Sequence, residues 1–125
     1  MSSKGFQRPW INGYGAKIVT FQVLPNGTST PTIGENPDGV LSSVSYDGVG
    51  VYTMTLNSTF LALRSFSCSV QLAAAADTQV QLTSEDVSGA GTLTTTILTA
   101  GVAANIAANA GNILHFTLVL RDSGQ

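Results

Sequence analysis

Charge is the scarcest property of this sequence. Its 125 residues include five Lys or Arg and seven Asp or Glu, or 10% charged residues, whereas an ordinary soluble domain carries about 25%. The net charge of −2 is too small to indicate a nucleic-acid partner. Neutral Ser, Thr, Gln and Asn supply the polarity instead, and neutral surfaces cost less to desolvate against another protein than charged ones. This composition favours a protein that packs into an assembly, although a low-charge soluble β protein also fits it.

Cysteine and histidine each occur once, as Cys68 and His115. A single cysteine cannot form an internal disulfide, so nothing implies an oxidising compartment. Cys68 alternates with apolar residues, which predicts a small buried side chain rather than a reactive thiol. One histidine excludes a zinc site built from several imidazoles, and no nucleophile-elbow pattern is present. We therefore expect that the protein is not an enzyme, with no catalytic residue and no bound cofactor or metal.

The carboxylates include one adjacent pair, Glu85 and Asp86. Asp38 and Asp47 each precede a glycine, a pattern typical of turns. Paired carboxylates can serve glycoside hydrolysis or hold calcium, but neighbours in a loop usually do neither. Calcium binding at residues 85 and 86 stays open as an alternative on the sequence alone.

Long apolar runs are absent as well. No stretch approaches the roughly 20 residues that cross a bilayer as a helix, and residues 1–15 lack the apolar core of a signal peptide. We expect no membrane partner, and a protein that stays in the cytoplasm where it is made unless it leaves on a particle.

Strict alternation of apolar and polar residues dominates what is present. It predicts seven strands in one all-β domain, at residues 17–23, 40–46, 51–57, 65–73, 78–83, 92–98 and 112–121. Strands separated by turn residues indicate an antiparallel β-sandwich with jelly-roll or Greek-key connections. Asp47 and Gly48 are expected to form a tight turn with positive φ. The alanine-rich residues 101–111 are expected to form a loop with one helical turn, close to a neighbouring chain or to the protein's own sheet.

The first sixteen residues differ from the remainder and predict an extended N-terminal arm, residues 1–16, before a sandwich domain, residues 17–125. Glycines and Pro9 oppose regular structure there, and the arm carries large aromatic side chains. Such residues are typical anchors at protein interfaces. The candidate partner-binding residues are Phe6, Arg8, Trp10 and Tyr14. An arm that folds back over its own sandwich is the competing interpretation.

Residues 48–56 read G-V-G-V-Y-T-M-T-L, which resembles a G-x-G-x-Y-T-x-T-L segment of small structural proteins of tailed bacteriophages. Further segments follow in the same order. They are F-L-A-L at residues 60–63, L-A-A-A-A-D-T at 72–78, the alanine-rich stretch 103–110 and a short R-D-S at 121–123. The resemblance covers residues 40–123, and the order of the segments is more specific than any one of them.

The resemblance implies a virion protein on the capsid surface, assembled in the host cytoplasm. The function that the resemblance implies first is that of a capsid decoration, or cement, protein that binds the outer shell and bridges neighbouring capsid subunits. The implied partners are the major capsid protein and further copies of the chain, as a homotrimer at three-fold positions. A head or tail fibre module that binds the host or a glycan is the alternative.

Overall fold

The computed structural model describes residues 16–121, which contain strands, turns and loops and no helix. This confirms the all-β class. The described strands are β1 (Ala16–Leu24), β2 (Thr32–Ile33), β3 (Leu41–Gly48), β4 (Val51–Leu56), β5 (Ala62–Gln71), β6 (Thr78–Asp86), β7 (Thr92–Thr99), β8 (Val102–Ala103) and β9 (Ile113–Arg121). The seven longer strands are the seven that alternation predicts. The two short strands carry no sequence pattern, because two residues are too few to show a period.

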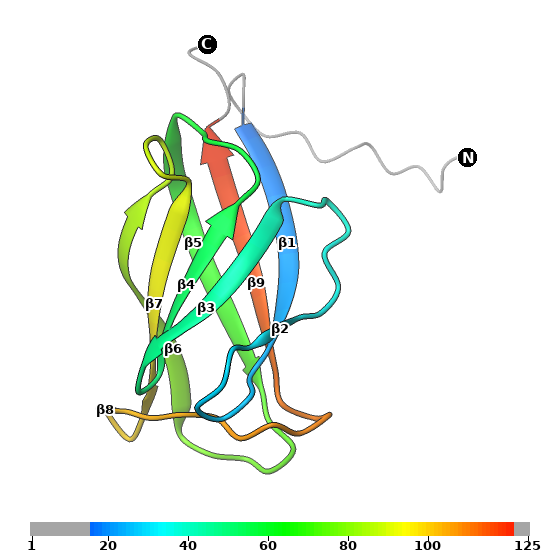
Figure 1. Cartoon of the computed structure of the whole chain (residues 1–125), viewed down its shortest axis with the longest axis vertical. Coiled ribbons are helices and arrows are strands. Elements are labelled where there is room, and N and C mark those ends of the chain that lie inside the picture. The colour runs from blue at the N-terminus through cyan, green and yellow to red at the C-terminus, as the bar shows by residue number, and fades with distance from the viewer. Residues whose placement is uncertain (1–15, 122–125) are drawn as a thin grey trace, which may run out of the picture.

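The strands form two antiparallel sheets that face each other (Figure 1). One sheet has the order β2-β1-β9-β5, and the other has the order β3-β4-β7-β6, with β8 also paired to β7. The β3–β4 and β6–β7 pairs are sequential neighbours in one sheet, whereas the connections β4–β5 and β5–β6 cross between the sheets. The predicted antiparallel sandwich is therefore confirmed, and its jelly-roll or Greek-key assignment stays a prediction.

The core lies between the four inner strands β1, β4, β7 and β9. Apart from Lys17 and Thr99 near the strand ends, their inward side chains are at most 5% exposed, and they are Val19, Phe21, Val23, Tyr52, Met54, Leu56, Leu93, Thr95, Ile97, Leu114, Phe116, Leu118 and Leu120. The rings of Phe21 and Phe116 stack with centroids 5.2 Å apart. Because successive side chains of a strand point to opposite faces, the alternating sequence places these residues together without any helical segment.

The turn between β3 and β4 differs from the expectation. It consists of Val49 and Gly50, and it is Gly50 that has a positive φ, +71°. Asp47 is instead the extra residue of a bulge between the Tyr46–Tyr52 and Gly48–Val51 pairs, where its carboxylate accepts hydrogen bonds from the hydroxyls of Ser45 and Thr53. The prediction that Asp47 and Gly48 form the turn is therefore wrong, because these bonds hold Asp47 within the strand.

The expected helical turn in residues 101–111 is also wrong. That segment contains β8 and irregular loop. A Cβ added to Gly111 would lie 3.0 Å from the Cβ of Ala73, so the small residues allow two loops of the same chain to approach closely. The high helix propensity of alanine is outweighed by this packing and by the β-pairing of Val102 and Ala103 with β7.

One side of the sandwich is covered by the loop between β1 and β3. We call residues 25–40 the sealing loop. Its backbone pairs with β1, because Gly34 N–H donates to the carbonyl of Gln22 and Gln22 N–H donates to the carbonyl of Glu35, both at 2.8 Å. The side chain of Asn36 holds both backbone groups of Leu41, where β3 begins. The loop therefore ties the edge of one sheet to the edge of the other.

The opposite side has no such cover among the described residues. It is bordered by β5 and β6, the edge strands of the two sheets. Here the inward apolar side chains are only half-buried, although they pack against the core. We call this set the seam, and it consists of Phe66, Cys68, Val70, Leu72, Val80 and Leu82.

Candidate functional site

The predicted partner-binding residues Phe6, Arg8, Trp10 and Tyr14 lie outside the described residues. The described chain starts at Ala16, the last residue of the predicted arm, which already pairs with Arg121 of β9. Arg121 also pairs with Ala62, the first residue of β5. The predicted arm therefore joins the sandwich at the end of the four-stranded sheet where β1 and β5 begin and β9 ends.

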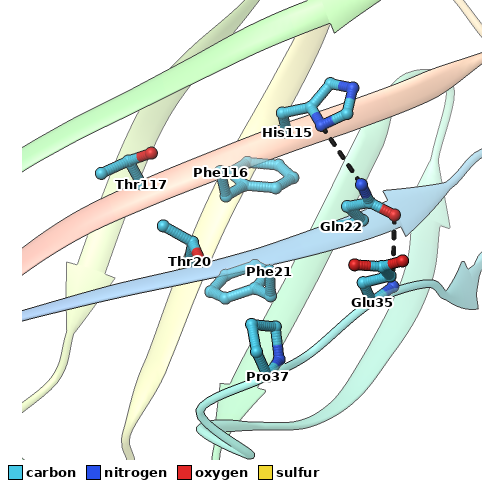
Figure 2. Close-up of a pocket in the computed structure, with 8 residues that line it drawn as sticks. All are labelled: Thr20, Phe21, Gln22, Glu35, Pro37, His115, Phe116 and Thr117. Atoms are coloured by element: carbon cyan, nitrogen blue, oxygen red, sulfur yellow. Dashed lines mark hydrogen bonds between the residues drawn. The ribbon is translucent and has the colours of Figure 1, made fainter. Parts of the chain in front are cut away.

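A hollow of about 230 Å³ lies on the outer face of the four-stranded sheet, between β1, β9 and the sealing loop. Figure 2 shows its lining, in which hydroxyl, amide, imidazole and carboxylate groups and the rings of Phe21, Phe116 and Pro37 belong to β1, β9 and the sealing loop. The residues that line it are Thr20, Phe21, Gln22, Glu35, Pro37, His115, Phe116 and Thr117. The rings of Phe21 and Phe116 are at most 2% exposed, so the groups that a ligand would meet here are polar apart from the exposed ring of Pro37.

A row of hydrogen bonds crosses this face. The backbone N–H of Glu35 donates to Gln22 Oε1 at 3.2 Å, and Gln22 Nε2 donates to His115 Nδ1 at 3.4 Å (Figure 2). On the other side of the ring, His115 Nε2 lies 2.9 Å from Gln71 Oε1. An amide nitrogen only donates and an amide oxygen only accepts, so the network assigns the imidazole proton to Nε2.

Strand register creates this row. His115 of β9 stands opposite Gln22 of β1 and Ser69 of β5, and Gln71 follows two residues later on the same face. Gly34 brings the sealing loop onto Gln22, because a Cβ at this position would lie 3.0 Å from Gln22 Cβ. The prediction that His115 faces outward on the last strand is confirmed. The sequence did not indicate its partners, since the register between distant strands has no local signal.

The side chains that line the hollow can donate and accept hydrogen bonds. Glu35 and His115 are its two titratable residues, and both ring nitrogens of His115 are engaged by glutamine amides rather than by a hydroxyl. A serine-type arrangement needs a histidine that accepts the proton of a nucleophile, and the hydrogen bonds of His115 do not form one. The lining therefore offers amide and imidazole groups that already form hydrogen bonds within the chain, together with hydroxyl and carboxylate groups.

The adjacent carboxylates Glu85 and Asp86 serve the turn that follows β6. Glu85 Oε1 accepts from the N–H of Val87 at 3.1 Å, and Asp86 Oδ2 accepts from the N–H of Ala90 at 3.0 Å. Within residues 16–121, no group of three or more His, Cys, Asp or Glu is arranged to hold a metal ion. The carboxylate pair thus has a structural explanation in turn formation.

Cys68 occupies the position that alternation predicts, on the inward side of β5 and half-buried. Burial raises the pKa of its thiol to about 12. Because the thiolate is the reactive form, this environment suppresses nucleophilic chemistry at neutral pH.

Charges in the described strands stand at strand ends and bulges. Lys17 lies near the start of β1, Arg64 near the start of β5, and Arg121 at the end of β9, while Asp47 marks the bulge of β3 and the Glu85–Asp86 pair ends β6. The strand side chains at the centre of both outer faces consequently include no Asp, Glu, Lys or Arg. Carboxylates lie against these faces only from the bulge, at Asp47, and from the sealing loop, at Glu35 and Asp38. The uncharged side chains on the four-stranded sheet include Thr20, Ser67, Ser69 and Thr117, and on the other sheet Thr53, Thr55, Thr92, Thr94, Thr96, Gln79 and Gln81.

A second hollow, of about 330 Å³, lies at the end of the sandwich opposite the arm junction, between the loops that follow β5 and β8. Alanine and asparagine side chains provide most of its lining. Asn112 Oδ1 accepts a hydrogen bond from the N–H of Ala73 at 2.8 Å, so these polar groups already serve to join the two loops.

No family model, no curated protein and no solved structure matches this chain. Among the described residues, no helix has the length and hydropathy required to span a membrane.

Proposed function

We propose that this chain is a structural protein of a tailed-bacteriophage virion, namely a capsid decoration protein that binds the outer shell and bridges neighbouring capsid subunits. The observation that carries the proposal is the neutral outer surface of both sheets, with charge confined to strand ends, bulges and loops. Hydroxyl and amide faces can be buried against a protein without leaving an unpaired charge. The ordered resemblance of residues 40–123 to phage structural proteins supports the same role.

The proposed mechanism is mechanical. A copy that contacts two neighbouring capsid subunits binds the second at high effective concentration, so many weak contacts resist the opening of the shell together. The major capsid protein is the proposed partner, at the capsid surface, with assembly in the host cytoplasm. Phe6, Arg8, Trp10 and Tyr14 remain the proposed anchors on the shell. The junction at Ala16 and Arg121 lies at one end of the sandwich.

Binding of the purified chain to undecorated phage shells tests this function. We expect co-sedimentation with shells, and decorated shells that withstand heating and low osmolarity better than undecorated ones. Deleting residues 2–15 leaves the Ala16–Arg121 pair intact and should abolish binding while circular dichroism still reports a folded β protein. Equal survival of decorated and undecorated shells would overturn the cement function, and full binding without residues 2–15 would move the anchor to the sandwich.

A glycan-binding fibre module is the second candidate, and the hollow beside His115 is the observation that favours it. Amide, hydroxyl and carboxylate groups there match the hydrogen-bonding needs of a sugar. Sugar sites usually add an aromatic face, yet Phe21 and Phe116 are buried beneath this hollow, and residues 25–39 and 84–91 contain no aromatic residue. Chemical shift changes confined to Gln22, Glu35 and His115 on titration with host surface glycans, and lost in Gln22→Ala, would favour this candidate.

A further inference from the structure

The side of the sandwich that carries the seam is bordered by two open strand edges. β5 ends one sheet and β6 ends the other, and no strand of residues 16–121 pairs beyond them. Proteins usually protect such edges with charged residues, proline or bulges. Residues 65–76 and 78–84 contain neither charge nor proline. The bulges lie at Arg64, near the start of β5, and at Thr83, in the second half of β6, so residues 65–71 and 78–82 offer regular backbone for further pairing.

The apolar surface between these edges is incompletely covered. The inward side chains of β1 and β9 are nearly all buried, whereas each seam residue stays partly exposed on β5, β6 or the connection between them. A row of partly exposed apolar side chains beside two strand edges that no strand of residues 16–121 pairs with is typical of a surface that binds protein.

The direction of the strands decides which partner fits. Phe60 N–H donates to the carbonyl of Val87 at 2.9 Å, so the start of β5 lies beside the end of β6 and the two edges run antiparallel. Rotation of a second copy by 180° about an axis parallel to the strands places its β6 beside β5 of the first. The paired edges are then antiparallel, both sheets continue across the interface, and the two seams face each other.

The charged residues at one end of the seam are placed as this two-fold arrangement requires. Exposed Arg64 lies near the start of β5, and exposed Glu85 and Asp86 end β6. Since the start of β5 and the end of β6 are at the same level, the rotation sets Arg64 of each copy near Glu85 and Asp86 of the other. Two opposite-charge contacts result, and they favour this register over a displaced one.

We propose that the seam binds a second copy of this chain, with β5 of each copy paired to β6 of the other around a two-fold axis. The interface does not depend on the virion function proposed above. The homotrimer expected from the resemblance is a competing arrangement. Around a three-fold axis, β5 and β6 of one copy cannot both pair with β6 and β5 of the same second copy, so the two sheets do not continue together across one interface.

Sedimentation velocity of the full chain over a range of concentrations tests the stoichiometry. We expect a species of twice the chain mass that dissociates on dilution. A single copy at the highest concentrations, about 100 µM, where even weak specific complexes form, would overturn the interface. A species of three chains or an open-ended polymer would overturn the two-fold geometry.

Charge reversal tests the register. Arg64→Glu and Glu85→Arg should each raise the dissociation constant at least about tenfold, and the double variant should return to within about threefold of the natural chain. Lys17→Glu makes the same change of charge on β1, two strands from the β5 edge, and should leave the constant unchanged. If the dissociation constant of the double variant stays as high as that of the single variants, the proposed contact between Arg64 of one copy and Glu85 of the other is refuted.

Hydrogen exchange locates the interface independently of any substitution. Peptides that cover residues 65–71 and 78–82 should exchange more slowly at high than at low protein concentration, because their outer N–H groups gain partners. Peptides from β3 should show no dependence on concentration. Protection that appears on β3 or on an outer sheet face, and not on β5 and β6, would overturn the proposal.

Discussion

The two sides of this sandwich differ in how the backbone groups of their edge strands are covered. On one side the sealing loop supplies backbone and side-chain partners to β1 and β3. It carries the turn residues, prolines and carboxylates that suit a solvated segment. On the other side, no strand of residues 16–121 pairs with the outer edges of β5 and β6, and the apolar residues between these edges are half-buried. The first side is complete within one chain, and the second has the features of a surface that a partner completes.

The depth to which an inward side chain is buried depends on the position of its strand in the sheet as well as on the strand's alternating pattern. β5 has as regular an alternation as β9, yet Leu114, Phe116, Leu118 and Leu120 are fully buried while Phe66, Cys68 and Val70 are not. Position in the sheet explains the difference, because among the strands of residues 16–121 β9 has a neighbour on each side and β5 has one.

The largest expected difference between the sides comes from matched removal of two phenylalanine rings. Phe21→Ala, in the covered core, should lower the free energy of unfolding by about 3–5 kcal/mol. Phe66→Ala, on the seam, should cost about 1–2 kcal/mol in a single copy, because its ring is already partly hydrated. Urea denaturation at concentrations that keep the chain monomeric measures both, and equal losses would contradict the distinction between the sides.

The sealing loop should depend on one side chain. Asn36→Ala removes two hydrogen bonds to Leu41, at 2.8 and 3.3 Å, and should cost about 2 kcal/mol. Asn26→Ala, in the same loop, removes one exposed bond to the carbonyl of Thr30 and should cost less than about 0.5 kcal/mol. The denaturation midpoints of the two variants compare them, and an Asn36 effect no larger than that of Asn26 would argue against the loop as a tie between sheets.

Alkaline pH should weaken the fold through one group on the seam and one in the core. Burial raises the pKa of Cys68 from 9.0 to about 12, and burial together with Tyr46 raises that of Tyr52 from 10.0 to about 12. Both groups are neutral in the folded state, so the stability they contribute is complete below their unfolded pKa values and is lost as pH rises towards 12. Between pH 8 and pH 10 we expect a loss of about 1.5 kcal/mol.

Cys68→Ala separates the two contributions to this pH dependence. Cys68 has the lower unfolded pKa, so its removal should abolish most of the loss between pH 8 and pH 10, whereas Tyr52→Phe should change the slope chiefly above pH 10. Denaturant titrations at each pH provide the measurement. An unchanged slope in Cys68→Ala would show that the thiol is not desolvated on the seam.

The smallest expected effect is a gain in stability within the core. Thr95 Oγ1 and Tyr52 Oη are buried without a hydrogen-bond partner among the described residues. Thr95→Val replaces the hydroxyl with a methyl group and should raise the free energy of unfolding by up to about 1 kcal/mol. Thr94→Val, on the outer face of the same strand, should change it by less than about 0.5 kcal/mol. A loss of stability in Thr95→Val would indicate that its hydroxyl has a partner.

Alternation was sufficient to predict the seven long strands and the orientation of particular side chains. Cys68 faces inward and His115 outward, as predicted, because side-chain direction in a strand follows from position along the chain. The turn at Val49 and Gly50 was missed, because the carboxylate of Asp47 finds partners on Ser45 and Thr53 and keeps its residue in the strand. The row that joins Gln22, His115 and Gln71 was missed because its members are far apart in sequence.

By itself the sequence determined the all-β class, the inward face of each long strand and a surface with little charge, since these depend on period and composition alone. Only the tertiary structure decided which strands lie in the middle of a sheet and which at an edge, and therefore which inward faces are fully buried. It also decided that Arg64 and the Glu85–Asp86 pair stand at the same end of the seam. The physical reason is that strand order and register arise from contacts between distant segments, which no local pattern records.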